Sequence, residues 1–427
     1  MRAGLKYFLW LLIGAAVVWA VLASADTAGQ RKLFFAEGNE ELYDYWMPRM
    51  CLEQGYKTAK CVDWDMDDKD AAQLGYPPEE EGCISLSGWY RTRSGARLFI
   101  TGSVDKVYPA FALLPLKFFP QTRGGAYCWT IFAGLLFLAS LVLCARSRDR
   151  RIASCFWPLA FACSMPFIFN FERGNPVWLS AAAVGVFLAW WNSDSPCRRR
   201  WAAIALGVAA VLKIAPAVLG ILYLVEWIAC SRAKKEEGVR AQRRQIGIDI
   251  AWSAGTAIVL FFAAWLFVPE KFAALPMMLQ NAAHHADTVR RQADFGLIAL
   301  WRAVRIFFGQ DIRSIWSGMI AVSNLSQLGG AAVLLWGAWK RDYLLLIGGM
   351  LLAAGNMYYY AALYLLPVFV LQCPVGWLRL ALWFTILCPL QLVVAGNSGN
   401  SVLCNLALYA LLALHFIRSL KVRVNET

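Results

Sequence analysis

Apolar segments long enough to cross a membrane recur along almost the whole chain. Of its 427 residues, 59% are hydrophobic and 16% are charged, whereas a soluble domain is ~45–50% apolar and ~25% charged. A helix of about 20 apolar residues spans the ~30 Å hydrocarbon core of a bilayer. We therefore expect an all-α polytopic membrane protein, with residues 1–427 forming a single integral membrane domain. The segments that we expect to be helical are 6–24, 126–145, 152–171, 175–192, 248–268, 314–339, 343–357, 361–376, 378–396 and 401–417.

The positions of the basic residues predict how these segments are oriented. The net charge is +13, and cytoplasmic loops of membrane proteins are enriched in Lys and Arg. With every basic cluster in the cytoplasm, we expect about ten to twelve membrane helices in the cell (inner) membrane, with both termini cytoplasmic. The basic clusters are Arg146–Arg151, Arg198–Arg200, Arg232–Arg244, Lys340–Arg341 and Arg418–Arg423.

This orientation places two long polar segments outside the cell. They are a first loop, residues 25–105, and a second loop, residues 269–312, whereas residues 231–247 form a basic cytoplasmic loop. The shorter outer connections are expected at Phe171–Pro176, Tyr358–Tyr360 and Gly396–Asn400.

Residues 201–230 have basic residues on both sides but are too few for two full crossings. A short helical hairpin that turns at Lys213-Ile-Ala-Pro216 satisfies the charge rule, because Pro216 disfavours a continuous helix. Lys213 would then face a wet cavity rather than lipid. The alternative is one long tilted helix, which would invert every later segment and place Arg232–Arg244 outside.

The first apolar segment and the loop after it leave two points open. Arg2 and Lys6 before segment 6–24, and Ala-Ser-Ala after it, resemble a signal peptide, but the run is long enough to span and we expect it to remain uncleaved. Cys51, Cys61 and Cys83 lie in the first loop. If the loop is outside the cell, two of them can pair.

Asp44 is the candidate catalytic residue of the first loop. It stands in Glu-Leu-Tyr-Asp-Tyr-Trp, at the start of an amphipathic stretch over Tyr43–Gly55 that could lie along the membrane surface. A carboxylate there meets the polar end of a lipid-linked substrate, and partial desolvation would make it a better base near neutral pH. The alternative is an exposed helix carboxylate with no catalytic role.

The end of the first loop contains further candidates. Asp105 and Tyr108 precede an apolar stretch, Phe111–Phe119, that is too short to span and is interrupted by Pro115. We interpret this stretch as a second interfacial helix. Asp105 either caps this helix or lines the site. The acidic insert 64–81 could bind a divalent cation through carboxylate oxygens, although a solvated surface segment explains it as well, and we expect no cofactor.

Basic residues on the same face suggest an anionic substrate. Arg173 lies in Phe-Glu-Arg-Gly-Asn-Pro, with Glu172 beside it, and offers a planar set of donors for phosphate. Lys213 is a second cation at the tip of the hairpin. Alternatively, Arg173 only extends to the membrane interface. His284 and His285 in the second loop could also donate to phosphate or transfer protons.

The order of these motifs resembles glycosyltransferase family 87. It runs from an acidic residue in the first loop through Tyr108-Pro109, Arg173-Gly174-Asn175 and Leu212-Lys213…Pro216 to aromatic residues before Leu-Leu-Pro, Tyr358–Pro367. The resemblance covers roughly residues 1–375. It implies a GT-C fold and an inverting mannosyl- or arabinosyltransferase-like enzyme of the cell envelope.

The resemblance also implies a set of roles. The enzyme would take a monosaccharide from a polyprenyl-phosphate donor, on the extracytoplasmic side, to a lipid-linked or envelope glycan acceptor. Asp44 would be the general base, and Arg173 and Lys213 would bind the donor phosphate. The chain departs from the family pattern at Asn175, where the family has Gln, and at Ala110, where it has Pro. Tyr359 or Tyr360 stands where the family often has His.

Two other functions remain compatible with an apolar bundle that carries cations on one side. The first is a lipid-glycan flippase or transporter, which would be expected to have polar residues on both faces of its path. The second is a non-catalytic subunit of envelope assembly that docks through the first loop. No nucleic-acid partner is expected, and the sequence has no Walker A or dinucleotide glycine motif to support nucleotide-driven or redox chemistry.

Overall fold

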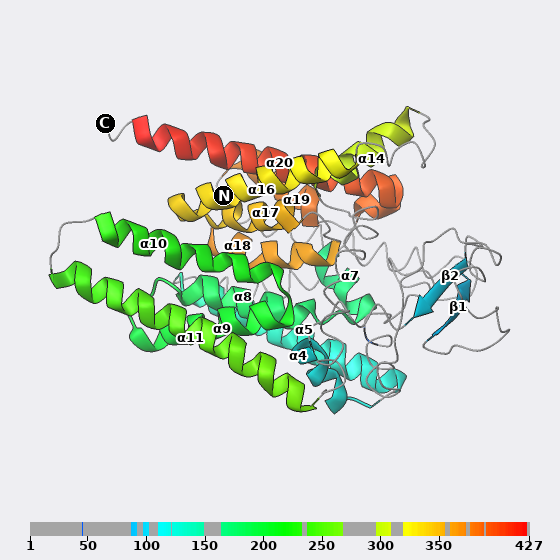
Figure 1. The fold of residues 1–427 in the computed structure, drawn as a ribbon. Coiled ribbons are helices and arrows are strands. Elements are labelled where there is room, and N and C mark those ends of the chain that lie inside the picture. Colours follow the sequence, from blue (N-terminus) through cyan, green and yellow to red (C-terminus); the bar gives the residue numbers. More distant parts are fainter. Residues whose placement is uncertain are drawn as a thin grey trace.

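A computed structural model gives the fold. It describes residue 45 and residues 87–91, 97–101, 110–120, 122–148, 164–232, 237–267, 296–308, 319–354, 359–372, 376–387 and 390–424. Within these ranges the chain is a bundle of helices, with one short strand pair at one end of it (Figure 1). Four of the described helices are long and apolar enough to cross a membrane, namely Gly124–Arg146, Ala215–Arg232, Gly238–Ala264 and Val402–Leu420.

Among the described residues, α5 and α8 match the predicted segments 126–145 and 175–192, and α11 contains nearly all of segment 248–268. Several of the helices pack in sequence order, so that α5 contacts α8, α8 contacts α9, and α9 contacts α11. Their bounds are α4 Ala110–Leu113, η2 Leu114–Phe118, α5 Arg123–Arg146, α7 Met165–Arg173, α8 Val177–Trp190, α9 Pro196–Leu212, η3 Ala215–Gly220, α10 Ile221–Arg232 and α11 Glu237–Phe267.

The later helices complete the bundle. Helices α16 and α17 form the most extensive helix pair, and α17 also contacts α18 and α20. The bounds are α14 Leu297–Phe307, α16 Met319–Lys340, α17 Tyr343–Ala354, η4 Tyr359–Tyr364, α18 Leu365–Leu371, α19 Trp377–Leu387 and α20 Leu390–Val424.

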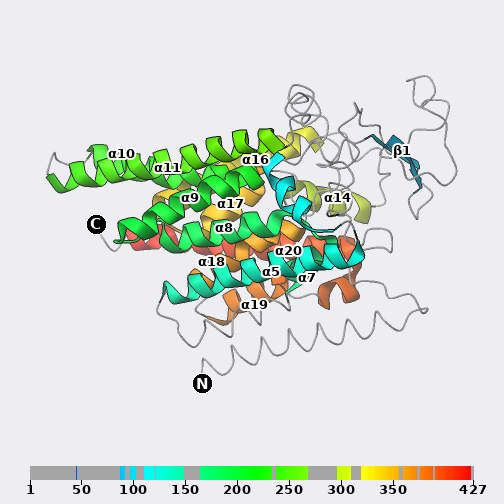
Figure 2. The same ribbon diagram turned by 90° about the horizontal axis from the view of Figure 1, so that it is seen from below.

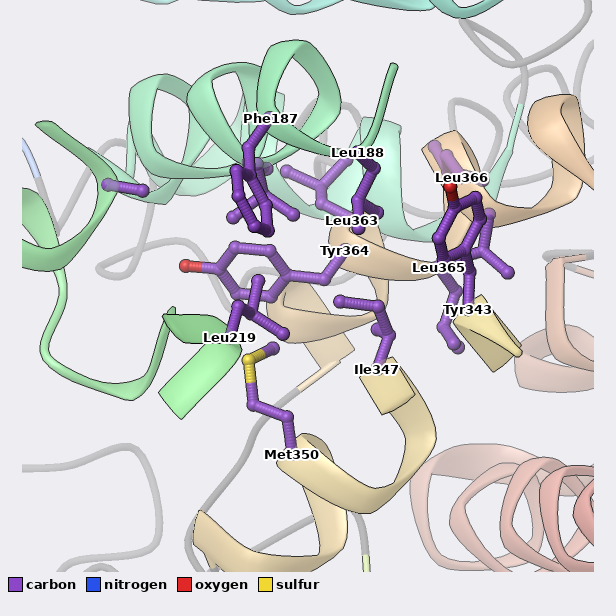
Figure 3. Close-up of a cluster of buried hydrophobic side chains, with 14 of the residues drawn as sticks. Phe187, Leu188, Leu219, Tyr343, Ile347, Met350, Leu363, Tyr364, Leu365 and Leu366 are labelled. Carbon is purple, nitrogen blue, oxygen red and sulfur yellow. The ribbon is translucent and has the colours of Figure 1, made fainter. Parts of the chain in front are cut away.

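Aliphatic and aromatic side chains from α8, η3, α17, η4 and α18 fill the centre of the bundle. Tyr364 is fully buried there among Phe187, Leu219 and Met350 (Figure 3). Its hydroxyl lies 2.9 Å from the hydroxyl of Ser180, which donates in turn to the carbonyl of Ala209. A buried polar group that keeps its hydrogen bonds avoids most of the cost of leaving water.

Glycines allow α16 and α17 to approach closely. A Cβ atom on Gly330 would meet the backbone of Leu352 and Ala353, and one on Gly337 would meet the backbone of Leu345 and Leu346. Small residues at a helix interface allow two backbones to pack at short range, which is the usual means of association inside a membrane.

The predicted reversal at Lys213 is confirmed. Helix α9 ends at Leu212, Lys213 has extended backbone angles (φ −151°, ψ 127°), and η3 begins at Ala215 with Pro216 buried in it. The alternative of one long helix is therefore excluded. At 1.5 Å per residue, the 17 residues of α9 extend about 25 Å, so the hairpin is longer than the half-membrane one that the sequence suggested.

The two ends of the bundle differ in chemistry. The end of α10, the start of α11 and the C-terminal end of α20 lie at one end, opposite β1 and β2 (Figures 1 and 2). This basic end contains the ion pairs Arg199–Asp249 at 2.6 Å and Arg341–Glu226 at 2.9 Å. The described residues of the basic clusters therefore share this end of the bundle.

The first loop contains secondary structure that the sequence did not predict. Strands β1, Ser87–Arg91, and β2, Arg97–Thr101, pair antiparallel, with Ser87 opposite Thr101 and Arg91 opposite Arg97. Where one helix was expected over Phe111–Phe119, the structure has two short pieces, α4 and the 3-10 helix η2. Of the amphipathic stretch that begins at Tyr43, the structure describes Tyr45 alone, which is helical.

Three expected loops are partly or wholly helical. Gly396–Asn400, expected as an outer turn, lies inside α20. Gly and Asn each cost only about 1 kcal/mol or less in a helix interior, so these residues do not exclude a helix. Residues 231–247, expected as a basic loop, are helical from Glu237, and residues 269–312 include α14.

Candidate functional site

Two cations and two aromatic rings form a row at the end of the bundle opposite the basic end. The guanidinium carbon of Arg173 lies 5.8 Å from the ring centroid of Phe169, and the ammonium of Lys213 lies 5.3 Å from that of Tyr360. The two rings are stacked, with centroids 6.5 Å apart and planes inclined by 18°. Each cation is within the ~6 Å at which a ring face attracts positive charge. We call these four residues the cation–ring row.

The row joins three parts of the chain that are distant in sequence. Phe169 and Arg173 are four residues apart on α7, so they lie on the same helix face. Lys213 stands at the reversal after α9, where its amide donates to the carbonyl of Ala209. Tyr360 is in η4. The row therefore depends on how α7, α9 and η4 pack together.

The turn after Arg173 is held by hydrogen bonds on both sides. Gly174 has a left-handed backbone (φ 65°), which favours glycine, and its amide closes α7 on the carbonyl of Asn170. The side-chain oxygen of Asn175 accepts from the amide of Val177 at 2.9 Å, and Asn175 is fully buried. The fully buried indole of Trp129, on α5, donates to the carbonyl of Gly174 at 2.9 Å.

Asn170 fastens the turn to η4. Its side-chain nitrogen donates to the carbonyl of Pro166 at 2.7 Å and to the carbonyl of Tyr360 at 3.1 Å. The side chain is fully buried, and its oxygen has no hydrogen-bond partner among the described residues. One buried amide thus sets the spacing between α7 and η4.

The residue that follows Asp44 is anchored to the start of α5. The hydroxyl of Tyr45 donates to the carbonyl of Pro120 at 2.8 Å, and Tyr45 is fully buried. Phe119, beside Pro120, packs edge-on against Trp129, with ring centroids 5.6 Å apart. Trp129 therefore contacts the turn after Arg173 directly. It is linked to Tyr45 through the neighbouring residues Phe119 and Pro120.

Comparison with known protein families identifies the family of the chain. The family described as Glycosyltransferase family 87 matches residues 107–358, which is more than half of the chain. The chain belongs to glycosyltransferase family 87. The matched range contains three of the four residues of the cation–ring row. The fourth, Tyr360, lies two residues beyond it. No curated protein and no solved structure matched the chain.

Membership in family 87 identifies the chain as a glycosyltransferase, and its long apolar helices make it a membrane protein. A glycosyltransferase needs a sugar donor and an acceptor. The transporter and assembly-subunit alternatives are not supported by this membership.

The structure brings together only part of the predicted site of this family 87 enzyme. Arg173, Lys213 and Tyr360 share the cation–ring row, and Asn175 supports the turn beside them. For Glu172 and Tyr359 only the backbone is described, in α7 and η4. Asp44, Asp105, Tyr108, His284 and His285 lie outside the described residues, as do the acidic insert and the three cysteines of the first loop.

Sequence reasoning missed three side chains that build this site. Phe169 could have been found, since it stands four residues before Arg173 in a helical segment. Asn170 is a polar residue inside an apolar run, which is a recognisable signal. Trp129 has no such signal, because it is one of 20 tryptophans in the chain.

Proposed function

We propose that this family 87 enzyme transfers a monosaccharide, mannose-like or a pentose, from a polyprenyl-phosphate donor. The acceptor is a lipid-linked or envelope glycan on the extracytoplasmic face of the cell membrane. The observation that carries the proposal is the cation–ring row, which brings Arg173 and Lys213 to one end of a membrane-embedded bundle. Two fixed cations are suited to a phosphate group.

The distribution of charge supports the proposed side of the membrane. The cation–ring row lies at the end opposite the basic end, where Arg199, Arg341 and the start of α11 gather. Basic residues mark the cytoplasmic side, which supports an extracytoplasmic site. A polyprenyl-phosphate donor suits this location because its lipid tail keeps it in the membrane while its phosphate and sugar stay at the surface.

The reaction is a single displacement with inversion at the anomeric carbon. An acceptor hydroxyl oxygen forms the new bond to that carbon, and Asp44 takes the hydroxyl proton. The bond between the anomeric carbon and the phosphate oxygen breaks, and its electron pair leaves with the polyprenyl phosphate. Arg173 and Lys213 stabilise the negative charge that develops on that phosphate.

The remaining predicted residues have supporting roles in this proposal. His284 and His285 add donors to the phosphate, while Asp105, Tyr108, Glu172 and Tyr359 line the site. Asn175 supports the Arg173 turn from its buried position. The aromatic faces of Phe169 and Tyr360 keep the two cations in fixed places, which limits the reorganisation that the reaction requires.

The test compares cations from the two ends of the bundle. Lys213→Met and Arg173→Gln should each lower kcat/KM for a polyprenyl-phosphate sugar by about 10²-fold or more, as loss of a preorganised charge contact does. The matched controls are Lys340→Met and Arg243→Gln, on helices of the basic end. Lys340 lies over the ring of Trp336 at 5.5 Å, and Arg243 lies over the ring of Trp227 at 4.6 Å. Equal losses in the variants and the controls would contradict the proposal.

A further inference from the structure

We infer that Trp129 is a positioning residue that, together with Tyr45, holds the Arg173–Gly174–Asn175 turn in register with the chain next to Asp44. The inference rests on the proposed function, in which Asp44 is the base and Arg173 binds the donor phosphate. Trp129 itself is fully buried and acts through other residues.

The first step is the hydrogen bond from Trp129 to the turn. The indole Nε1 donates to the carbonyl oxygen of Gly174 at 2.9 Å in a buried setting. The Gly174 amide is already bonded to Asn170, so both polar groups of this glycine are held. These two bonds fix the direction of the backbone directly after Arg173. Without the indole donor, the buried carbonyl of Gly174 would lose its hydrogen bond.

The second step is the packing of the same indole on the end of η2. Phe119 meets Trp129 edge to face, with centroids 5.6 Å apart and planes inclined by 69°. Aromatic pairs prefer this geometry. Trp129 thus contacts the Arg173 turn with its polar edge and the segment Phe119–Pro120 with its ring.

The third step is the bond from Tyr45 to that segment. The Tyr45 hydroxyl donates to the Pro120 carbonyl at 2.8 Å, and the amide of Thr122 donates to the same oxygen at 2.8 Å. A Cβ atom on Gly125 would collide with this carbonyl, so glycine is needed there. Tyr45 directly follows Asp44, the proposed base, in the sequence, which is why this contact matters for the proposed function.

Three contacts therefore join two parts of the proposed active site that are about 130 positions apart in the sequence. A displacement of about 1 Å between a base and the reacting carbon can cost about 10²-fold in rate. A residue that sets this distance should change kcat more than the KM for the donor, because the cations that bind the phosphate remain.

The experiment replaces Trp129 by Phe in the full chain, which removes the indole donor and keeps a ring. The matched control is Trp178→Phe. Trp178 is equally buried, packs against Phe167 and Phe137, and its Nε1 has no hydrogen-bond partner among the described residues. We expect Trp129→Phe to lower kcat at least 10-fold with the donor KM within about 2-fold, and Trp178→Phe to leave kcat within about 3-fold of wild type. Equal effects of the two variants would overturn the inference.

A second readout does not depend on the substrate. Hydrogen–deuterium exchange followed by mass spectrometry should show faster exchange in the peptides that contain Tyr45 and Gly174 in both Trp129→Phe and Tyr45→Phe, but not in Trp178→Phe. If this pattern appears while wild-type protein does not use polyprenyl-phosphate sugars, the proposed donor is wrong and the positioning contact stands. If Trp129→Phe leaves exchange at Tyr45 unchanged, the positioning contact does not exist.

Discussion

The side-chain nitrogen of Asn170 lies 3.1 Å from the carbonyl oxygen of Tyr360, 190 positions later in the chain. The bond is partly buried and joins α7, which ends at Arg173, to η4, whose Tyr360 ring lies under Lys213. This neutral amide therefore helps to hold the two cations of the site relative to each other.

Replacing Asn170 by Leu should loosen the cation–ring row. Leucine has a similar size but donates no hydrogen bond, so the Pro166 and Tyr360 carbonyls both lose a partner, at a cost of about 1–3 kcal/mol. We expect a lower thermal unfolding midpoint and a higher donor KM, measured in detergent. Thr130→Val is the control, because its buried hydroxyl bonds only within its own helix, to Ala126. An unchanged KM in Asn170→Leu would show that the amide does not position the row.

The ring of Tyr360 should matter more than its hydroxyl. Tyr360→Leu removes the face on which Lys213 rests and the stack with Phe169, whereas Tyr360→Phe keeps both. A cation–ring contact is worth about 0.5–2 kcal/mol, so the Leu variant should raise donor KM by several-fold to about 30-fold. Steady-state kinetics on the two variants would test this, and a Phe variant as impaired as the Leu variant would assign the effect to the hydroxyl instead.

Two adjacent glycines of α16 should respond differently to the same substitution. A methyl group on Gly330 would meet the backbone of Ala353 and Leu352, whereas one on Gly329 meets nothing within 4 Å. Gly330→Ala should therefore destabilise the protein by about 1–3 kcal/mol through overpacking, and Gly329→Ala should be neutral or slightly stabilising. Thermal unfolding of both variants measures the difference, and equal midpoints would contradict the close packing of α16 and α17.

Asp342 should make stability depend on pH. It lies in the turn between α16 and α17, where burial alone would raise its pKa. The hydrogen bond from His415 at 2.9 Å and those from the amides of Leu344 and Leu345 outweigh burial and lower the pKa of Asp342. A lowered pKa means that the ionised group stabilises the fold above the ordinary Asp pKa of about 3.9, and that this contribution is lost as pH falls through the folded-state value.

The variant Asp342→Asn isolates this charge, because asparagine can still accept the two amides at the start of α17. Wild type should unfold at a higher temperature than Asp342→Asn near pH 6, and the gap should narrow as the pH falls below the ordinary Asp pKa of about 3.9. A gap that does not change with pH would show that the carboxylate charge contributes nothing.

The parts of the fold that sequence reasoning predicted correctly have strong local signals. The span over α5 follows from an uninterrupted apolar run, and the reversal at Lys213 follows from Pro216 and the basic residues on both sides. The turn expected at Gly396–Asn400 was wrong, because its residues are typical of a loop but lie inside α20. Helix propensity is a weak guide where neighbouring helices decide.

Sequence reasoning singled out the two cations of the candidate site but missed the side chains that support them. Arg173 and Lys213 each lie over a ring of the stacked pair Phe169 and Tyr360, and that they bind phosphate stays a prediction. The bonds that hold them, from Asn170 and Trp129, connect residues 190 and 45 positions apart. Contacts of that range depend on how the helices pack and cannot be derived from local spacing.

The most direct test of the proposed mechanism is the rate of sugar transfer from a polyprenyl-phosphate monosaccharide by the purified Asp44→Asn variant. Asparagine cannot accept the acceptor proton as a carboxylate does, so kcat should fall by about 10²–10⁴-fold while the donor still binds. Asp194→Asn, at an exposed position beyond α8, is the control and should retain full activity. Turnover by Asp44→Asn at the wild-type rate would contradict the assignment of Asp44 as the general base.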